Sequence, residues 1–550
     1  MDTRRLILVL IFAFSSFMLF ESWQKYNQPQ VAANTVATNS SGNAIPKPST
    51  SLQGSTSTNS ATPMVTAVAP VGETFTISTD LLKAKISAQG GDLVELELIK
   101  YRDHDNKDKN FVLFDAKHQY IAQSGLIGDG LPNHRSVFKR IDGPTSLVEG
   151  SNELKIRLES ESSNGIKVAK ILTFKRNSYL IDVAWEVFNG SDKPIAPHAY
   201  YQLQRDDVKP EGEATMVSTF TGPAVFTEAE KYQKIAFSDI EKGDAKFAKT
   251  ADNGWLAMVQ HYFVAAWVPL DKTPREFYMR KLETSNTYQA GLIVPITEIP
   301  PGAKSETSVR LFSGPQQQAT LKALAPGLDL VVDYGWLTVI AAPIFWALQA
   351  IHNIVGNWGW AIVVLTVILK GIFFPLSAAS YKSMAKMKLL TPRLTQLKER
   401  YGDDKQRLNQ EMMKMYQTEK VNPLGGCLPI LVQIPVFIAL YWVLLGAVEM
   451  RDAPWILWIQ DLASKDPYYI LPVLMIISMF VQTKLNPKPP DPLQAKLMTM
   501  MPLIFGVMFL TFPSGLVLYW VVNNILSIAQ QWQITRMIGA GGKAANDDKA

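Results

Sequence analysis

The spacing of hydrophobic positions divides the chain into two regions. Between residues 71 and 316, apolar and polar residues alternate in short segments, for example at 73–78, 154–159 and 179–188. A period of two is that of a half-buried strand, and Gly, Asn, Asp or Pro separates the segments. Residues 259–268 are interpreted as one further strand. Many short strands without helical patterns between them predict an antiparallel β sandwich.

Helical patterns begin after residue 316. Residues 317–357 are interpreted as an amphipathic region that lies in the outer membrane interface without crossing the bilayer. Five apolar runs follow, at residues 358–377, 427–447, 469–483, 497–512 and 515–534. Runs of this length predict a bundle of five transmembrane helices within residues 358–537. The break at Phe512-Pro513-Ser514-Gly515 makes the last two helices a tight hairpin.

The N-terminal residues predict a membrane anchor followed by a tether. Arg4 and Arg5 precede an apolar run at residues 6–20, as in an export signal. The run ends in Phe20-Glu21-Ser22-Trp23 instead of small residues, which favours an uncleaved signal-anchor helix over residues 1–26. The alternative is a signal peptide cleaved near Ala32-Ala33. Residues 27–70 are rich in Asn, Ser, Thr and Pro, which predicts a flexible low-complexity linker.

The distribution of basic residues predicts the orientation. Ten Lys and Arg lie between residues 378 and 426, whereas the loop at 448–468 has only Arg451 and Lys465. Basic loops stay in the cytosol. Both termini, including a tail at residues 538–550, are therefore expected in the cytosol. The β domain is expected on the outer side of the membrane.

Several kinds of chemistry have no support in the sequence. No phosphate-binding Gly-Lys-Ser/Thr loop and no His-Glu-x-x-His motif is present. The histidines lack metal-ligand spacing, and Cys427 is the only cysteine, so an intramolecular disulfide is impossible. A net charge of +5 is too small to indicate nucleic-acid binding. The sequence predicts no enzyme, cofactor, metal site or specific DNA binding.

One ionisable residue interrupts the apolar runs. Lys370 lies ten residues after Trp360, which at ~1.5 Å per residue puts it near the middle of a ~30 Å bilayer core. A lysine there costs about 2.5–3.5 kcal/mol on insertion scales unless water or a partner reaches it. The five runs contain no Asp or Glu that could pair with it. A water-filled cavity is the simplest solution.

Other polar residues in the five runs could complete a hydrophilic groove. The candidates are Thr366, Gln433, Ser478, Gln482, Asn523, Asn524 and Ser527, beside the aromatic residues Tyr519 and Trp520. The alternative is that Lys370 extends to the cytosolic headgroups while the amides hold helices together.

A basic segment at residues 380–420 predicts a cytosolic helical hairpin. Its helices flank Tyr401-Gly402, with Asp403 as the N-cap of the second helix and Asp404 beside it. Methionines, including Met384, Met387, Met412 and Met415, suit a surface that accepts different apolar segments. They suit gap-filling in a membrane core equally well. The basic charge could face anionic lipid, ribosomal RNA or solvent.

Several motifs together resemble one family. They are Lys-Ser-Met-Ala-Lys-Met from 382, Gly-Asp-Asp-Lys-Gln-Arg from 402, Val-Asn-Pro-Leu-Gly-Gly-Cys-Leu-Pro from 421, Asp-Pro-Tyr-Tyr-Ile-Leu-Pro from 466 and Phe-Pro-Ser-Gly-Leu-Val-Leu-Tyr from 512. In this order and spacing they closely resemble the YidC/Oxa/Alb family of membrane protein insertases. The resemblance covers residues 330–537, and the β domain looks like the Gram-negative periplasmic domain, a supersandwich similar to galactose mutarotase.

The resemblance implies a groove open to the cytosol and to lipid. Its positive charge, commonly an arginine, falls on Lys370, its threonine on Thr366 and its aromatic pair on Tyr519 and Trp520. The implied partners are nascent membrane proteins, the lipid bilayer, the Sec translocon (SecYEG and SecDF), and the ribosome or the signal-recognition-particle pathway. The implied function is insertion and folding of membrane proteins, alone or with the translocon. A channel or secondary transporter and a non-catalytic translocon scaffold are the alternatives.

Overall fold

The computed structural model describes residues 45–48, 73–104, 106–161, 165–210, 219–269, 272–402, 404–419, 421, 428–486 and 492–547. These residues form two compact units, a β unit that ends at Val332 and a helical unit that begins at Asp333. The predicted signal anchor and most of the predicted linker lie outside the described residues.

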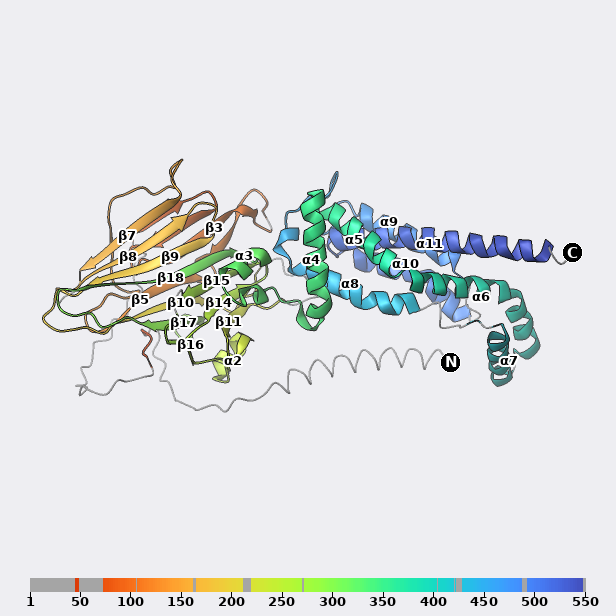
Figure 1. Cartoon of the computed structure of the whole chain (residues 1–550), viewed down its shortest axis with the longest axis horizontal. Helices are drawn as coiled ribbons and strands as arrows, with labels where there is room; N and C mark the ends of the chain where they lie inside the picture. The colour runs from red at the N-terminus through yellow and green to blue at the C-terminus, as the bar shows by residue number, and fades with distance from the viewer. Residues whose placement is uncertain are drawn as a thin grey trace. The chain divides into compact units, whose positions relative to one another are not determined.

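The β unit contains two antiparallel sheets of nine strands each (Figure 1). The first sheet consists of β1 (Thr74–Ser78), β2 (Leu82–Ser87), β3 (Leu93–Arg102), β5 (Ile121–Ile127), β10 (His198–Arg205), β17 (Thr287–Pro295), β16 (Arg275–Leu282) and β13 (Thr250–Ala251), with β4 (Asn110–Phe114) paired to β3. The second consists of β12 (Lys231–Lys234), β11 (Gly222–Thr227), β14 (Trp255–Gln260), β15 (Phe263–Pro269), β18 (Lys304–Pro315), β9 (Leu180–Phe188), β8 (Lys167–Lys175), β7 (Glu153–Glu161) and β6 (Lys139–Arg140). Short helices α2 (Phe237–Lys242), α3 (Gln318–Leu324) and η1 (Leu328–Val331) complete the unit.

The two sheets pack face to face around an aromatic core, which confirms the predicted sandwich. Tyr201 of β10 and Trp267 of β15 come from different sheets, and their ring centroids lie 5.1 Å apart. In β9 every second side chain, including that of Trp185, is buried. Burying an apolar side chain of this size contributes roughly 1.5–3 kcal/mol. The alternation in the sequence therefore predicts which face of the strand forms the core.

One strand prediction was wrong. Residues 259–268 form two strands, because β14 ends at Gln260 and β15 begins at Phe263, and these two residues pair across the turn. Tyr262 in the turn has a φ of 68°, a left-handed conformation that the sequence does not signal with Gly or Asn. Both strands are buried on both faces, so neither shows a period of two, and only Gln260 and His261 interrupt the apolar run at the turn.

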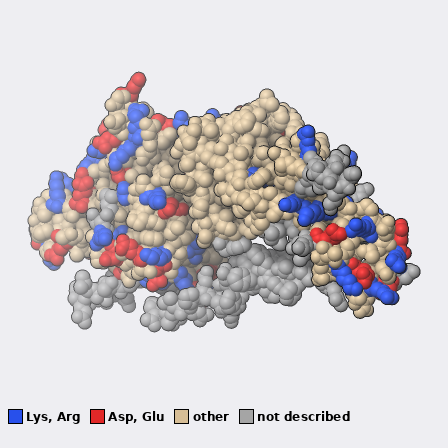
Figure 2. Space-filling view, turned by 45° about the vertical axis from the view of Figure 1, so that its right-hand side comes forward, with Lys and Arg blue, Asp and Glu red and all other residues tan. Residues whose placement is uncertain are grey.

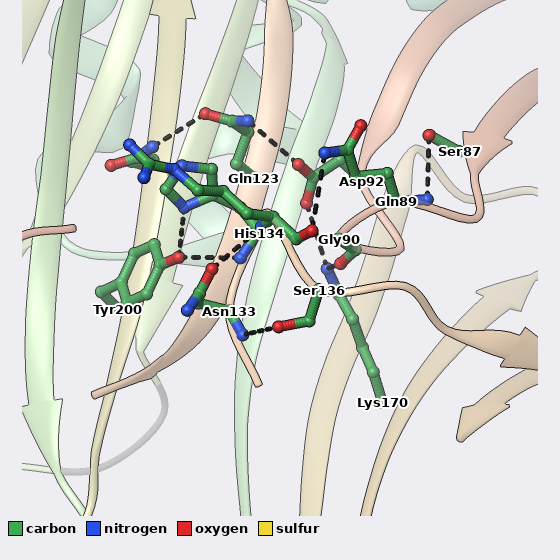
Figure 3. A network of polar contacts seen from close by, with 12 residues as sticks. Ser87, Gln89, Gly90, Asp92, Gln123, Asn133, His134, Ser136, Lys170 and Tyr200 are labelled. Atoms are coloured by element: carbon green, nitrogen blue, oxygen red, sulfur yellow. Dashed lines mark hydrogen bonds and ion pairs between the residues drawn. The ribbon is translucent and has the colours of Figure 1, made fainter. Parts of the chain in front are cut away.

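A polar network lies inside the β unit (Figure 3). Lys170 of β8, only 2% exposed, donates to the carbonyl oxygen of Gly90 at 2.8 Å and lies 3.5 Å from a carboxylate oxygen of Asp92. Gln123 donates to the other oxygen of Asp92 at 3.0 Å and accepts from Gln202 at 2.8 Å. Lys170 lies in β8 of one sheet, and Asp92 lies in the turn directly before β3 of the other, so the ion pair ties the two layers together.

Burial changes the acidity of two groups in this network. Burial raises the pKa of Asp92 from its ordinary 3.8 to about 6, although Lys170 opposes the rise. The His134 ring bonds the Tyr200 hydroxyl through Nδ1 at 2.5 Å, and its Nε2 has no partner among the described residues. Burial, with the nearby charges of Arg135, Arg280 and Lys170, lowers the pKa of His134 to about 4. His134 is therefore neutral at pH 7.

The helical unit contains eight α-helices among the described residues. They are α4 (Thr338–Val355), α5 (Trp358–Ile372), α6 (Phe374–Tyr401), α7 (Lys405–Thr418), α8 (Leu428–Gly446), α9 (Ile470–Leu485), α10 (Pro492–Phe509) and α11 (Ser514–Asp547), with 3₁₀ turns η2 (Gly335–Leu337) and η3 (Val448–Met450). The break between α10 and α11 lies at the predicted Phe512–Gly515 position. In Figure 2 the visible face of the helical unit carries few charged residues, which instead gather on the hairpin formed by α6 and α7.

The first predicted span is bent. The axes of α5 and α6 differ by 66° at the break around Phe373, and Pro375 occupies the first turn of α6, where its missing N–H is not needed. The first arm of the hairpin therefore begins at Phe374 instead of residue 380. The second arm, α7, is capped by Asp404, whose side chain accepts from the N–H groups of Gln406 and Arg407. The predicted cap was Asp403, which lies outside the described residues.

Length and hydropathy single out few complete spans among the described helices. α4 is long and apolar enough to cross a bilayer alone, and α5 with α6 would form a second, bent span. The apolar stretches Val432–Gly446, Ile470–Leu485 and Met498–Phe509 are shorter. One face of α4 is buried, while Val339, Trp346 and Ile354 on its surface are 84%, 73% and 85% exposed. The interfacial location of α4 and the five-span bundle stay predictions.

Candidate functional site: a polar cavity between apolar helices

A cavity lies where α5, the start of α6, α8 and α11 meet. Its volume is small, about 20 Å³, within about 420 Å³ of space between the atoms that includes open solvent. Its lining residues are Thr366, Leu369, Lys370, Phe373, Leu376, Ser377, Val432, Gln433, Val436, Tyr519 and Asn523. Among these described residues none is acidic, and Lys370 is the one charged group. The lining thus combines a cation and several neutral polar groups with an apolar wall.

Lys370 forms its hydrogen bond with a neutral partner. Its ammonium donates to Ser527 Oγ on α11 at 2.7 Å. Ser527 Oγ in turn donates to the carbonyl oxygen of Asn523 at 2.7 Å, one helical turn earlier. The hydroxyl of Tyr381, on α6, lies close enough to interact with the Ser527 side chain. Lysine has three N–H donors, so one hydroxyl leaves two of them for water or a ligand.

The other polar groups in the cavity come from four helices, with Ser377 on α6 and the rest on α5, α8 and α11. Gln433 of α8 donates to the side-chain oxygen of Asn523 and to the Tyr519 hydroxyl, the latter at 3.5 Å. Thr366 of α5 donates to the carbonyl oxygen of Ile362 in its own helix at 2.7 Å. These bonds satisfy the polar side chains within the apolar bundle without neutralising Lys370.

Four predicted groove residues lie elsewhere. Asn524 donates to Ser478 Oγ at 3.0 Å, and this buried bond joins α11 to α9 away from the cavity lining. Gln482 of α9 is half-buried and does not line the cavity. The Trp520 ring packs against Phe437 and Phe509, with centroid distances of 4.6 and 5.5 Å. The structure thus brings Lys370, Thr366, Gln433, Tyr519 and Asn523 together, with Ser527 directly behind them.

Sequence reasoning missed Ser377 and Tyr381, which lie at the start of α6. Ser377 lines the cavity, and Tyr381 is buried beside Ser527. Both residues follow Lys370 at helical spacing beyond the bend. Ser377 is the last residue of the apolar run at 358–377, and Tyr381 lies four residues past it. The predicted hairpin methionines, Met384, Met387, Met412 and Met415, are half-buried on α6 and α7 and do not line the cavity.

Asn357 fixes the start of the helix that carries Lys370. Its side-chain oxygen accepts from the N–H of Trp360 at 3.1 Å, so it caps α5. Its amide nitrogen donates to the carbonyl oxygens of Pro454 and Trp455 at 3.1 and 3.3 Å. One side chain thus caps the helix and ties its start to the loop between η3 and α9.

Replacing Asn357 with alanine should destabilise the helical unit by about 1 kcal/mol from the lost cap, and by more from the lost amide bonds. Asn357→Ser is the matched variant, because serine keeps the cap and loses only the bonds to Pro454 and Trp455. SDS-induced unfolding of the purified protein in detergent would measure both. Equal stability of the wild type and Asn357→Ala would contradict the assigned role.

These features define a class of protein: an integral membrane protein whose apolar helices surround a polar cavity with one cation. Comparison with known proteins identifies the group within this class. The chain belongs to the YidC family of inner-membrane proteins, because residues 74–347 match the YidC periplasmic domain and residues 350–540 match the 60Kd inner membrane protein family. The family assignment also confirms the resemblance noted from the motifs.

Full-length relatives support the same assignment. The chain is 75% identical to the membrane protein insertase YidC of Dechloromonas aromatica, with 100% of both chains covered. It is 58% identical to the protein of the same name from Aromatoleum aromaticum, with 98% of both chains covered. A crystal structure of an active YidC insertase with its first transmembrane domain resolved shares 19% identity over 84% of this chain and 92% of that one, at a TM-score of 0.41.

Proposed function

We propose that this protein inserts nascent proteins into the bacterial inner membrane and helps them to fold there. The cavity around Lys370 would hold the polar tail of a substrate while its apolar segment enters the lipid. The main support for this mechanism is the environment of Lys370, which lines a cavity between apolar helices and donates to a neutral hydroxyl. An ammonium without a carboxylate partner is suited to attract an acidic tail.

The energy for release comes from the substrate itself. Moving apolar surface from water into lipid contributes ~25 cal/mol per Å², so a hydrophobic segment leaves the cavity for the bilayer spontaneously. The polar wall lowers the barrier for the tail, because it replaces part of the water that the tail loses. The hairpin of α6 and α7 would first capture the segment, since Leu389 and Met413 expose apolar surface there.

The arrangement in the membrane belongs to the same proposal. Both termini and the α6–α7 hairpin would lie in the cytosol, with a signal anchor and five spans, as the distribution of basic residues indicates. The partners would be nascent membrane proteins and the lipid bilayer. The Sec translocon, the ribosome and the signal-recognition-particle pathway are partners that the family resemblance implies.

The test is insertion by purified protein reconstituted in liposomes. The substrate is a short single-span protein with an acidic tail, compared with the same substrate carrying a neutral tail. Lys370→Ala should reduce insertion of the acidic substrate by about tenfold, equivalent to 1.4 kcal/mol, and Lys370→Glu should reduce it further by repulsion. Lys370→Arg should retain activity because it keeps the charge. Lys496→Ala, at an exposed lysine of α10 outside the hairpin, is the matched control.

The other results distinguish the alternatives. Equal insertion by the wild type, Lys370→Ala and Lys370→Glu would remove the charge from the mechanism. No insertion by the wild-type protein alone would favour a scaffold that acts only with the translocon. Ion flux through the reconstituted protein would favour a channel or transporter.

A further inference from the structure

Ser527 has an unusual position for a serine in an apolar helix bundle. It is 3% exposed and donates its proton to the carbonyl oxygen of Asn523 in its own helix. Bonding the carbonyl four residues earlier is one way in which a serine within a helix satisfies its hydroxyl. Here its oxygen also accepts from Lys370 and interacts with Tyr381.

The two interactions join the two sides of the α5–α6 bend to α11. Lys370 lies three residues before Phe373, where the 66° bend occurs, and Tyr381 lies on the first part of α6 beyond it. Ser527 interacts with both side chains. The position of the Lys370 ammonium therefore depends on a contact shared with α6.

The bond between Lys370 and Ser527 can be replaced by a stronger bond between Lys370 and a carboxylate. A hydrogen bond from an ammonium to a carboxylate is roughly twice as strong as a bond between neutral groups, because both partners carry charge. A bond from an ammonium to a neutral hydroxyl has a strength between these two, because only one partner is charged. It can hold the ammonium against the cavity wall, and a carboxylate that enters the cavity can replace it.

We propose that Ser527, oriented by Tyr381, is a positioning residue that holds the Lys370 ammonium at the cavity until an acidic group of the substrate replaces the serine hydroxyl. Without this contact the flexible lysine side chain would extend toward the aqueous side and leave the cavity. The inference rests on the proposed insertase function and assigns a role to two residues outside the cavity lining. A purely structural alternative is that Ser527 and Tyr381 only hold α6 against α11.

The first test uses insertion by full-length protein in liposomes. Ser527→Ala should lower insertion of the acidic-tail substrate by about tenfold, the effect of losing one hydrogen bond to a charged group, and leave the neutral-tail substrate within about twofold. Ser527→Thr should restore insertion because it retains the hydroxyl. In a Lys370→Ala background, Ser527→Ala should have no further effect. Equal losses for both substrates, or a loss that persists without Lys370, would overturn the proposal in favour of the structural role.

A second test does not depend on insertion. A water-soluble amine-reactive reagent is applied to the reconstituted protein, and mass spectrometry measures modification of Lys370 relative to the exposed Lys382. Ser527→Ala and Tyr381→Phe should each increase the modification of Lys370 at least about threefold, because the ammonium is released toward water. Tyr381→Phe keeps the ring and its packing, so it remains informative if Ser527→Ala does not fold. Unchanged modification in both variants would overturn the positioning role, even if the wild type inserts nothing.

Discussion

Replacing Lys170 with methionine should lower the free energy of unfolding of the β unit by about 3–5 kcal/mol, because the change leaves Asp92 buried without its cation. Both side chains are almost fully buried, at 2% and 5% exposure. Gly90 would also lose a hydrogen bond to its carbonyl oxygen. Urea unfolding of the full-length protein in detergent, followed by brief proteolysis of the β unit, would measure the loss.

Two further variants show whether the missing charge is the cause. Lys170→Met combined with Asp92→Leu removes both charges and should recover much of the stability, because an apolar pair of similar volume avoids the desolvation cost. Lys175→Met breaks a pair with Asp182 at 2.6 Å whose members are 46% and 26% exposed. A partly exposed pair of this kind contributes about 0–1 kcal/mol. Equal effects of Lys170→Met and Lys175→Met would show that burial is not decisive.

The second large effect concerns pH. The folded β unit should hold a proton on Asp92 more tightly than the unfolded chain, since its pKa is about 6 instead of 3.8. Between these values the unfolded state releases a proton that the folded state keeps, so this group makes stability fall as the pH rises from 3.8 to 6. A pKa difference of this size corresponds to about 3 kcal/mol.

His134 changes the stability of the β unit in the opposite direction over nearly the same pH range. Its pKa is about 4 in the folded protein against 6.5 in the unfolded chain, so the unfolded state binds a proton that the folded state does not. Its contribution to stability is complete above pH 6.5 and is lost as the pH falls toward 4, again by about 3 kcal/mol. The two contributions should nearly cancel in the wild type.

Single variants would separate the two contributions. Relative to the wild type, Asp92→Asn should make stability rise more steeply from pH 4 to 6.5, because His134 then acts alone. His134→Gln should make it fall as the pH rises through the same range. The measurement to compare is the slope of the unfolding free energy against pH, because both variants also change the unfolding free energy at every pH. Parallel profiles for the wild type and both variants would refute the cancellation.

The sequence predicts the presence of a polar cavity, but it does not predict exactly which residues line it. Lys370 is recognisable because it is the one ionisable residue within a long apolar run. Asn523 and Asn524, however, are adjacent, and successive helical residues point about 100° apart. Only one of them can face the cavity, and the rotation of α11 decides which. The same holds for Tyr519 and Trp520, of which only Tyr519 lines it.

The β unit shows a similar limit. The alternation of β9 predicts its buried face correctly, because a strand at the sandwich core must bury every second residue. In β8, Lys170 occupies a core-facing position between Val168 and Leu172, which is a visible exception to the pattern. Its partner is distant in sequence, so the pattern alone does not reveal that Asp92 neutralises it.

The continuity of α6 has a mechanical consequence. The helix of 28 residues is about 42 Å long, and between Pro375 and Pro392 it contains neither proline nor glycine. The segment therefore behaves as a stiff rod with no hinge at the membrane surface. When a substrate chain pushes on the hairpin, we expect Ser377 and Tyr381 to tilt together with it. Binding at the hairpin would then also move the cavity wall beside Lys370.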